Sequence, residues 1–292
     1  MITLAVVALV TATALAGCGG TADDDASSPD ASDPGAATSS TSTSAPAPTT
    51  TTSAQPTQGS PPPDWLSTRV LPVDADGFGE IQPTPPELVD RQLWTTDLLP
   101  PPAGDAFESA IVAVPADVVA RSTWQPACPV NLEQLRYVTV SFYGFDGRFH
   151  TGELLVDADA AEGLVGVFSQ LHAARFPIEE MRITRTDELD APPTGDGNNT
   201  GAFVCRPVTG GSAWSEHTYG RAIDINPFHN PYVKDDLVLP ELASAYGDRG
   251  NLRPGMILPG DAVTQAFAGI GWEWGGAWNS LKDFQHFSAN GR

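Results

Sequence analysis

Two short segments in the C-terminal half of the chain constrain its fold more than any other feature. The first segment contains His217 and Asp224, and the second contains Asp283 and His286. A catalytic zinc ion takes three protein ligands from His, Asp and Glu and keeps a fourth position open for water. The sequence therefore predicts one zinc ion per chain, bound by His217, Asp224 and His286. Asp283 would then remain free to accept a proton from the bound water.

The spacing of these residues indicates how the chain brings them together. Residues 221–225 alternate between polar and apolar side chains, which is the pattern of a half-buried strand. We therefore expect Asp224 on this strand and His217 on the loop that enters it, with Gly220 giving the backbone room to turn. His286 lies among aromatic residues and is expected on a facing strand.

The same segments resemble a known family at several fixed positions. The positions that carry the resemblance are Ser215, His217, Gly220, Ala222 and Asp224, followed by Asp283, His286 and Phe287. They are similar to those of the VanY-type D-alanyl-D-alanine carboxypeptidases and the related L-alanyl-D-glutamate endopeptidases, with lysostaphin and the hedgehog signalling domain as more distant relatives. The resemblance covers roughly residues 128–288. It implies that the first His, the Asp and the last His bind zinc, and that Asp283 is the catalytic base.

The wider pattern of the chain predicts an α+β fold. Residues 135–143 and 149–156 have the pattern of a hairpin around an Asp-Gly turn, and residues 160–175 that of an amphipathic helix. The other expected elements are strands at 110–114 and 181–185, a long loop at 187–214, a helix at 261–270 and a strand that starts at 272. We therefore expect a small antiparallel sheet that carries the zinc site, with helices packed on one side. The resemblance to these peptidases (the LAS superfamily) and to the hedgehog domain implies the same fold.

The sequence of the N-terminal part predicts a signal peptide for export, followed by a linker that tethers the folded domain. Residues 1–17 contain an apolar run too short to span a bilayer, and Leu-Ala-Gly before Cys18 indicates a signal peptide of the lipoprotein type. Lipid on Cys18 would hold the protein at the outer face of the membrane. An ordinary signal peptide with an incidental cysteine is the alternative. Residues 18–63 are rich in Ser, Thr, Pro, Ala and Asp and predict a disordered linker. Residues 64–127 predict a Pro-rich extension, and residues 128–292 the zinc peptidase domain.

Net charge limits the classes of ligand that the protein can bind, and the cysteine content predicts a disulfide. The chain carries a formal charge of −21, of which five negative charges lie in the linker. So acidic a domain argues against nucleic acid or anionic lipid as a ligand. If Cys18 is lipidated, Cys128 and Cys205 remain, and in an exported protein they are expected to form a disulfide. The alternative, in which Cys205 is a metal ligand or a nucleophile, stays open.

These features predict a zinc-dependent peptidase that cuts the stem peptide of peptidoglycan, at either D-Ala-D-Ala or L-Ala-D-Glu. Arg206 is the first candidate to stabilise the oxyanion, and Arg185 is the second. The alternative is a non-catalytic, zinc-stabilised module that binds the cell wall. The presence of Asp283 favours the enzyme, because a structural zinc needs no base. No oligomeric state is predicted. Structural roles are expected for the other histidines, His150, His172 and His229.

Overall fold

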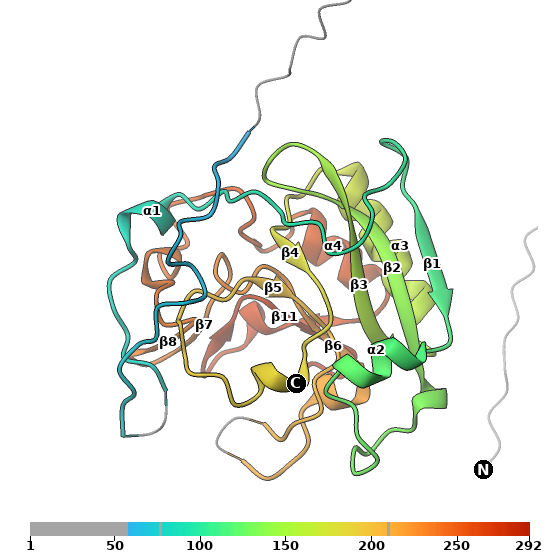
Figure 1. Cartoon of the computed structure of the whole chain (residues 1–292). Coiled ribbons are helices and arrows are strands. Elements are labelled where there is room, and N and C mark those ends of the chain that lie inside the picture. The colour runs from blue at the N-terminus through green and yellow to red at the C-terminus, as the bar shows by residue number, and fades with distance from the viewer. Residues whose placement is uncertain (1–57, 76–77, 209–210) are drawn as a thin grey trace, which may run out of the picture. The chain divides into compact units, whose positions relative to one another are not determined.

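The computed structural model describes residues 58–75, 78–208 and 211–292 (Figure 1). The predicted signal peptide, Cys18 and most of the predicted linker lie outside the described residues. Within the described ranges, no helix is long and apolar enough to cross a membrane.

The predicted hairpin forms the largest sheet. β2 (Leu135–Tyr143) pairs antiparallel with β3 (Phe149–Asp157), and β1 (Ser109–Val112) pairs with the other edge of β2. Alternate residues at the centre of β2 are buried, because one face of the sheet lies against the core. The helix α3 (Ala161–Ala173) packs on β2, and Figure 1 shows it beside β1 and β2.

The amphipathic pattern explains why α3 packs on this sheet. Its buried apolar side chains recur every three or four residues, at Ala161, Leu164, Val167, Phe168 and Leu171. This face joins the main hydrophobic core, which also takes in the helix α4 (Ala262–Gly269). α4 begins after Asp261, whose side chain accepts a hydrogen bond from the backbone N–H of Thr264. Both predicted helices therefore form, and they pack against each other.

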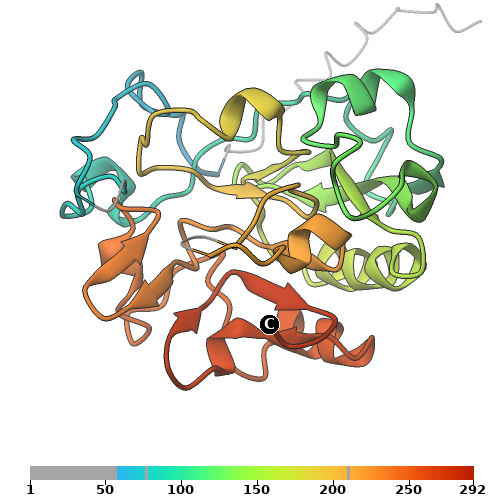
Figure 2. The ribbon, with the colours of Figure 1, turned by 90° about the horizontal axis from the view of Figure 1, so that it is seen from below.

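The C-terminal third of the chain forms two further small sheets. One has the order β6-β11-β9, with β6 (Ala222–Asp224), β11 (His286–Ser288) and β9 (Glu273–Trp274) all antiparallel. The other has the order β10-β7-β8, with β10 (Lys282–Asp283), β7 (Tyr232–Lys234) and β8 (Leu237–Leu239). In Figure 2 the C-terminal segment, drawn in red, gathers on one side of the molecule.

The α+β class agrees with the prediction, but the single small sheet does not, because the described strands form several. Pro231 directly precedes β7, Pro240 directly follows β8 and Gly275 directly follows β9, which limits the length of these three strands. The predicted strand at 181–185 is reduced to β4 (Glu180–Met181), which pairs in parallel with β5 (Asn199–Thr200). The remaining elements are short: α1 (Pro86–Val89), α2 (Ala116–Arg121), and 3-10 turns at Leu132–Gln134, Thr186–Glu188, Glu216–Tyr219, Ser244–Tyr246 and Gly275–Ala277.

The Pro-rich extension packs closely on the rest of the molecule. Its leucines form a second buried cluster with residues from the C-terminal half: Leu71, Leu88 and Leu93 with Phe228, Leu242, Tyr246 and others. The backbone of Ser60 exchanges hydrogen bonds with Gln92 and Trp94. Ordered contacts therefore reach into the segment that the sequence assigns to the linker.

Cys128 and Cys205 are joined by a disulfide across a separation of 77 residues. Both cysteines lie in a third buried cluster, together with Leu155 and Phe203. Because Cys205 is in a covalent bond, it is neither a metal ligand nor a nucleophile in this structure. The bond attaches the segment just before the candidate site to the region that precedes β2.

Candidate metal centre

His217 lies on a short 3-10 turn, Glu216–Tyr219, rather than on an open loop. The Ser215 hydroxyl caps this turn by accepting a hydrogen bond from the His217 N–H, at 3.3 Å. Gly220 ends the turn with a φ of +67°, and a Cβ at this position would lie 2.5 Å from the backbone nitrogen of Asp157. Only glycine fits there, and so the turn that the sequence predicts at Gly220 has a steric cause.

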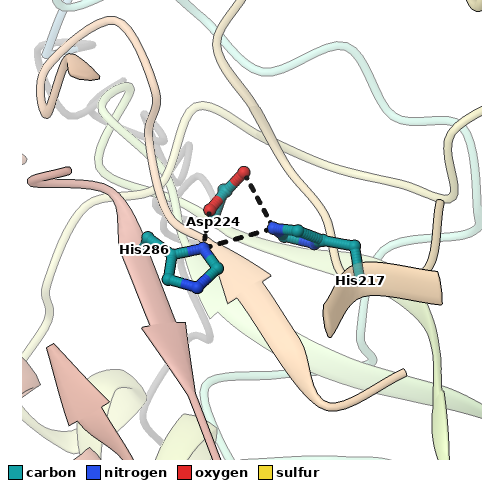
Figure 3. Close-up of side chains that lie close together, drawn as sticks. All are labelled: His217, Asp224 and His286. Atoms are coloured by element: carbon teal, nitrogen blue, oxygen red, sulfur yellow. Dashed lines mark hydrogen bonds and ion pairs between the residues drawn. The ribbon is translucent and has the colours of Figure 1, made fainter. Parts of the chain in front are cut away.

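Asp224 and His286 lie directly opposite each other on neighbouring strands. Asp224 is the last residue of β6 and His286 is the first of β11, and the two are paired in the antiparallel register. Gly201 exchanges two backbone hydrogen bonds with Asp224 on the other side, at 2.9 and 3.1 Å. Figure 3 shows both side chains pointing toward that of His217. We call His217, Asp224 and His286 the metal-site cluster.

The spacing within the metal-site cluster fits a tetrahedral zinc ion. His217 Nε2 lies 3.3 Å from His286 Nδ1 and 3.3 Å from Asp224 Oδ2, and His286 Nδ1 lies 3.0 Å from Asp224 Oδ1. Ligands that stand about 2.0–2.1 Å from zinc at tetrahedral angles are about 3.3 Å apart. The three side chains can therefore hold one metal ion with little rearrangement.

Hydrogen bonds behind the cluster orient both imidazoles. Nδ1 of His217 lies 2.6 Å from the Ala202 carbonyl oxygen, and Nε2 of His286 lies 2.9 Å from the backbone oxygen of Arg292. A carbonyl only accepts, so each of these nitrogens carries a hydrogen and donates. In the neutral tautomers, the lone pairs of the other two nitrogens then face each other and the Asp224 carboxylate. Such a convergence of donor atoms calls for a cation.

The electrostatics of the cluster agree with a cation site. Burial opposes a charged His286, but the hydrogen bond and the charge of Asp224 outweigh it and raise the pKa of His286 to about 9. Burial would also raise the pKa of Asp224, yet His217 and His286 hold it well below its usual range. Positive charge is therefore stabilised at the point where the three side chains meet, and a metal ion would compete there with a proton.

Asp283 lies beside the cluster without belonging to it. It ends β10, and burial followed by the charge of Asp224 raises its pKa to about 7, against the opposing charges of His286 and His217. Among the residues that the structure describes, its buried Oδ1 has no hydrogen-bond partner. A carboxylate with a free oxygen and a pKa near neutrality has the properties of a general base.

A close backbone approach holds Asp283 in this position. A Cβ at Gly275 would lie 2.7 Å from the Asp283 carbonyl oxygen, 2.9 Å from its Cβ and 3.3 Å from the His286 Cβ. A side chain at Gly275 would therefore push on the candidate base and on a candidate ligand together. The two neighbouring glycines of the Trp-Gly-Gly-Ala-Trp stretch are the only sequence signal for this contact.

The two candidate arginines differ in their relation to the site. The Arg206 backbone lies against the turn that carries His217, because Arg206 O accepts a hydrogen bond from the Thr218 hydroxyl at 2.8 Å. Its guanidinium donates to the Pro207 carbonyl at 3.1 Å. Arg185 instead pairs with the exposed Asp187 at 2.8 Å. The Arg206 backbone is therefore part of the hydrogen-bond framework around the His217 turn.

The other histidines lie in separate networks. His150 is buried between the carboxylates of Asp97 and Asp146, at 2.7 and 3.0 Å, and His172 stacks on Phe149 with ring centroids 4.2 Å apart. His229 is fully buried and bonds to the Arg91 carbonyl. Sequence reasoning missed Gly275 and the oxygens of Ala202 and Arg292 as supports of the site, because a backbone group leaves no mark in the residue pattern.

Comparison with known proteins adds one finding. Residues 209–289 match the model of a peptidase family described as D-alanyl-D-alanine carboxypeptidase. The match spans less than a third of the chain, and it contains the metal-site cluster and Asp283. No curated protein and no solved structure matches the chain. The match supports a peptidase of the VanY-like superfamily that acts on peptidoglycan, a superfamily that is generally zinc-dependent.

Proposed function

We propose that the protein is a zinc-dependent peptidase that cleaves a peptide bond in the stem peptide of peptidoglycan, of the D-Ala-D-Ala carboxypeptidase or L-Ala-D-Glu endopeptidase type. The observation that carries the proposal is the convergence of the three cluster side chains beside a carboxylate with an unpartnered oxygen. The family match over residues 209–289 supports the substrate class.

Each residue of the site has a role in this proposal. His217, Asp224 and His286 would hold one zinc ion, which would lower the pKa of a water ligand and polarise the scissile carbonyl. Asp283 accepts a proton from the attacking water and returns it to the leaving amine. Arg206 is the candidate that stabilises the negative charge on the carbonyl oxygen. The hydrogen bonds to Ala202 and Arg292 keep the two imidazoles in the tautomer that can bind a metal.

A non-catalytic module that binds the wall would need the zinc but not the base. The unpartnered Oδ1 and the raised pKa of Asp283 favour the enzyme, because a buried carboxylate oxygen without a partner is costly unless it has a use.

The test is digestion of purified peptidoglycan with the full chain, followed by mass analysis of the fragments. We expect release of D-Ala or of a peptide cut after L-Ala, loss of this activity with a chelator, and recovery with one equivalent of zinc. Intact stem peptides after incubation with the zinc-loaded protein, together with retention on the wall, would instead establish the binding module.

We also propose that lipid on Cys18 anchors the protein at the outer face of the membrane, with residues 18–63 as a tether toward the wall. The support is the apolar run that ends in Leu-Ala-Gly-Cys and the composition that follows it, which is rich in Ser, Thr, Pro, Ala and Asp. In Cys18→Ser the protein should leave the membrane fraction or remain unprocessed. Unchanged membrane partitioning and unchanged N-terminal processing in that variant would reduce the proposal to plain secretion.

A further inference from the structure

A concave feature lies next to the metal-site cluster. It is a groove of about 600 Å³ between α4 and the β9 region, and three indoles line it: Trp272, Trp274 and Trp278. We call it the tryptophan groove. It is open to solvent on the side of α4, where the exposed Ala268 belongs to its lining.

The tryptophan groove reaches the candidate active site. The ring of Trp278 lies against that of His286, with centroids 5.5 Å apart. A molecule in the groove would therefore contact the same indole that contacts a metal-site imidazole. The groove and the cluster can thus bind two parts of one substrate.

The walls of the groove are held in place before any ligand binds. The Trp274 indole donates a hydrogen bond to the Phe284 carbonyl at 2.9 Å. Gly276 packs directly under the same indole, since a Cβ there would overlap the Trp274 ring, 2.2 Å from its Cζ2. Trp272 is nearly buried and packs on Phe267 of α4. A preformed aromatic wall loses little entropy on binding.

The chemistry of the lining selects the kind of ligand. Indole faces bind flat apolar surfaces, and the neutral polar groups of Thr264, Asn279 and Ser280 offer hydrogen bonds beside them. Of the described residues that line the groove, Glu273 alone is charged. This combination suits a neutral ring with an apolar C–H face and a rim of hydroxyl and amide groups. An N-acetylated sugar has these properties, whereas an anionic ligand would meet a carboxylate and the strongly negative charge of the chain.

We propose that the tryptophan groove binds an N-acetylated sugar of the glycan strand that carries the stem peptide. The proposal rests on the proposed function, because that function supplies a substrate in which peptide and sugar are covalently joined. It makes the glycan-linked peptide, rather than a free peptide, the preferred substrate.

A blocking variant and a matched control are available on α4. Ala268→Phe places a ring in the groove, whereas Ala262→Phe places the same ring at an exposed position of the same helix that does not line it. Both positions are exposed, so neither substitution disturbs the core. Trp278 is unsuitable for this purpose, because its removal would also change the surroundings of His286.

Sugar binding is measured first, by titration of the full chain with tri-N-acetylglucosamine followed by NMR. We expect shifts in the indole N–H signals, and binding about five- to tenfold weaker in Ala268→Phe, the usual scale for loss of an aromatic contact. Ala262→Phe should bind like the wild type. Absence of binding to the wild type, or equal weakening by both variants, would overturn the proposal.

Activity then tests the link to the metal site. The rates of cleavage are compared for a disaccharide-linked stem peptide and for the same peptide without the disaccharide. We expect the wild type to prefer the linked form about five- to tenfold, and Ala268→Phe, but not Ala262→Phe, to bring this ratio toward one. Equal wild-type rates on the two substrates would refute the sugar subsite but would still support the proposed peptidase activity. If neither substrate is cut, the proposed function fails, and the sugar titration still decides what the groove binds.

Discussion

Two buried polar clusters in this molecule are built from similar side chains, but they differ in whether all their polar groups have partners within the protein. One is the metal-site cluster with the neighbouring Asp283. The other, which we call the Arg91 network, consists of Arg91, Glu179, Asn198 and His229, and it lies between the Pro-rich extension and the C-terminal half.

The Arg91 network is closed. Arg91 binds both oxygens of Glu179, at 2.8 and 2.6 Å, and its remaining Nη1 donates to the Asp196 carbonyl at 2.8 Å. Asn198 donates to Glu179 at 2.9 Å and lies 3.1 Å from His229 Nδ1, while His229 Nε2 donates to the Arg91 carbonyl at 2.9 Å. Each charged or polar group has a partner, as a structural network requires.

The metal-site cluster with Asp283 is open, in the sense that its polar groups do not all have partners. Two imidazole nitrogens and a carboxylate face a common point, and Asp283 Oδ1 has no partner among the described residues. Both clusters draw on one stretch of chain, because Asp224 and His229 are only five residues apart. Burial and residue type therefore do not separate a site from a structural network here. The combination of three converging ligand atoms with a neighbouring carboxylate oxygen that has no partner does.

The largest expected effect comes from removing two ligands of the open cluster. His217→Ala combined with His286→Ala leaves only Asp224 to bind the metal, so we expect loss of stoichiometric zinc and of all cleavage. Metal analysis of the purified protein measures this. His229→Gln is the matched control from the closed network and should retain one zinc per chain. Stoichiometric zinc in the double variant would place the metal elsewhere.

Breaking the closed network should cost stability instead. Glu179→Ala leaves the Arg91 guanidinium buried without its carboxylate, and we expect a loss of about 3–5 kcal/mol in the free energy of unfolding, measured with urea. The double variant Arg91→Met with Glu179→Leu removes both charges and should cost much less. If the single and double variants were equally unstable, packing rather than the ion pair would be responsible.

The pH dependence of stability gives a third contrast. Burial lowers the pKa of His229 to about 4, from 6.5 in the unfolded chain. The unfolded state therefore binds a proton more readily than the folded state does. The contribution of neutral His229 to the free energy of unfolding is fully present above about pH 6.5 and is lost as the pH falls toward 4. It amounts to about 3 kcal/mol.

His229→Gln isolates this contribution, because the amide can donate to the Arg91 carbonyl and accept from Asn198 without titrating. Unfolding measured between pH 7 and 4, with metal removed from both proteins, should show a flatter profile in the variant. Parallel profiles for the two proteins would mean that His229 does not titrate in this range.

The two clusters also differ in how far the sequence predicts them. The metal-site cluster is predictable because its residues have distinctive ligand chemistry, and because strand alternation and Gly220 indicate the local backbone around Asp224 and His217. The hairpin and both longer helices are predictable for the same reason, since their periodicity is local.

The Arg91 network is not predictable from local patterns. It joins Arg91 to Glu179 and His229, which lie 88 and 138 positions further along the chain, and Arg91 belongs to an extension without periodicity. Its residue types are common on surfaces, and only the fold shows that they are buried. The hydrogen bonds that orient the metal-site imidazoles escape prediction for a different reason, because they end on backbone oxygens that every residue possesses.

The smallest of these effects is the most specific for chemistry. Asp283→Asn keeps the shape of the side chain but removes its ability to take a proton, and so we expect cleavage to slow by roughly a hundredfold or more with zinc still bound. Zinc content and the rate on the same peptidoglycan preparation measure both parts. Because Asp283 Oδ1 has no hydrogen-bond partner among the described residues, the change breaks no bond at that oxygen and should cost less stability than Glu179→Ala. A near-normal rate would transfer the role of base to another carboxylate, with Glu216 beside His217 as the first to test.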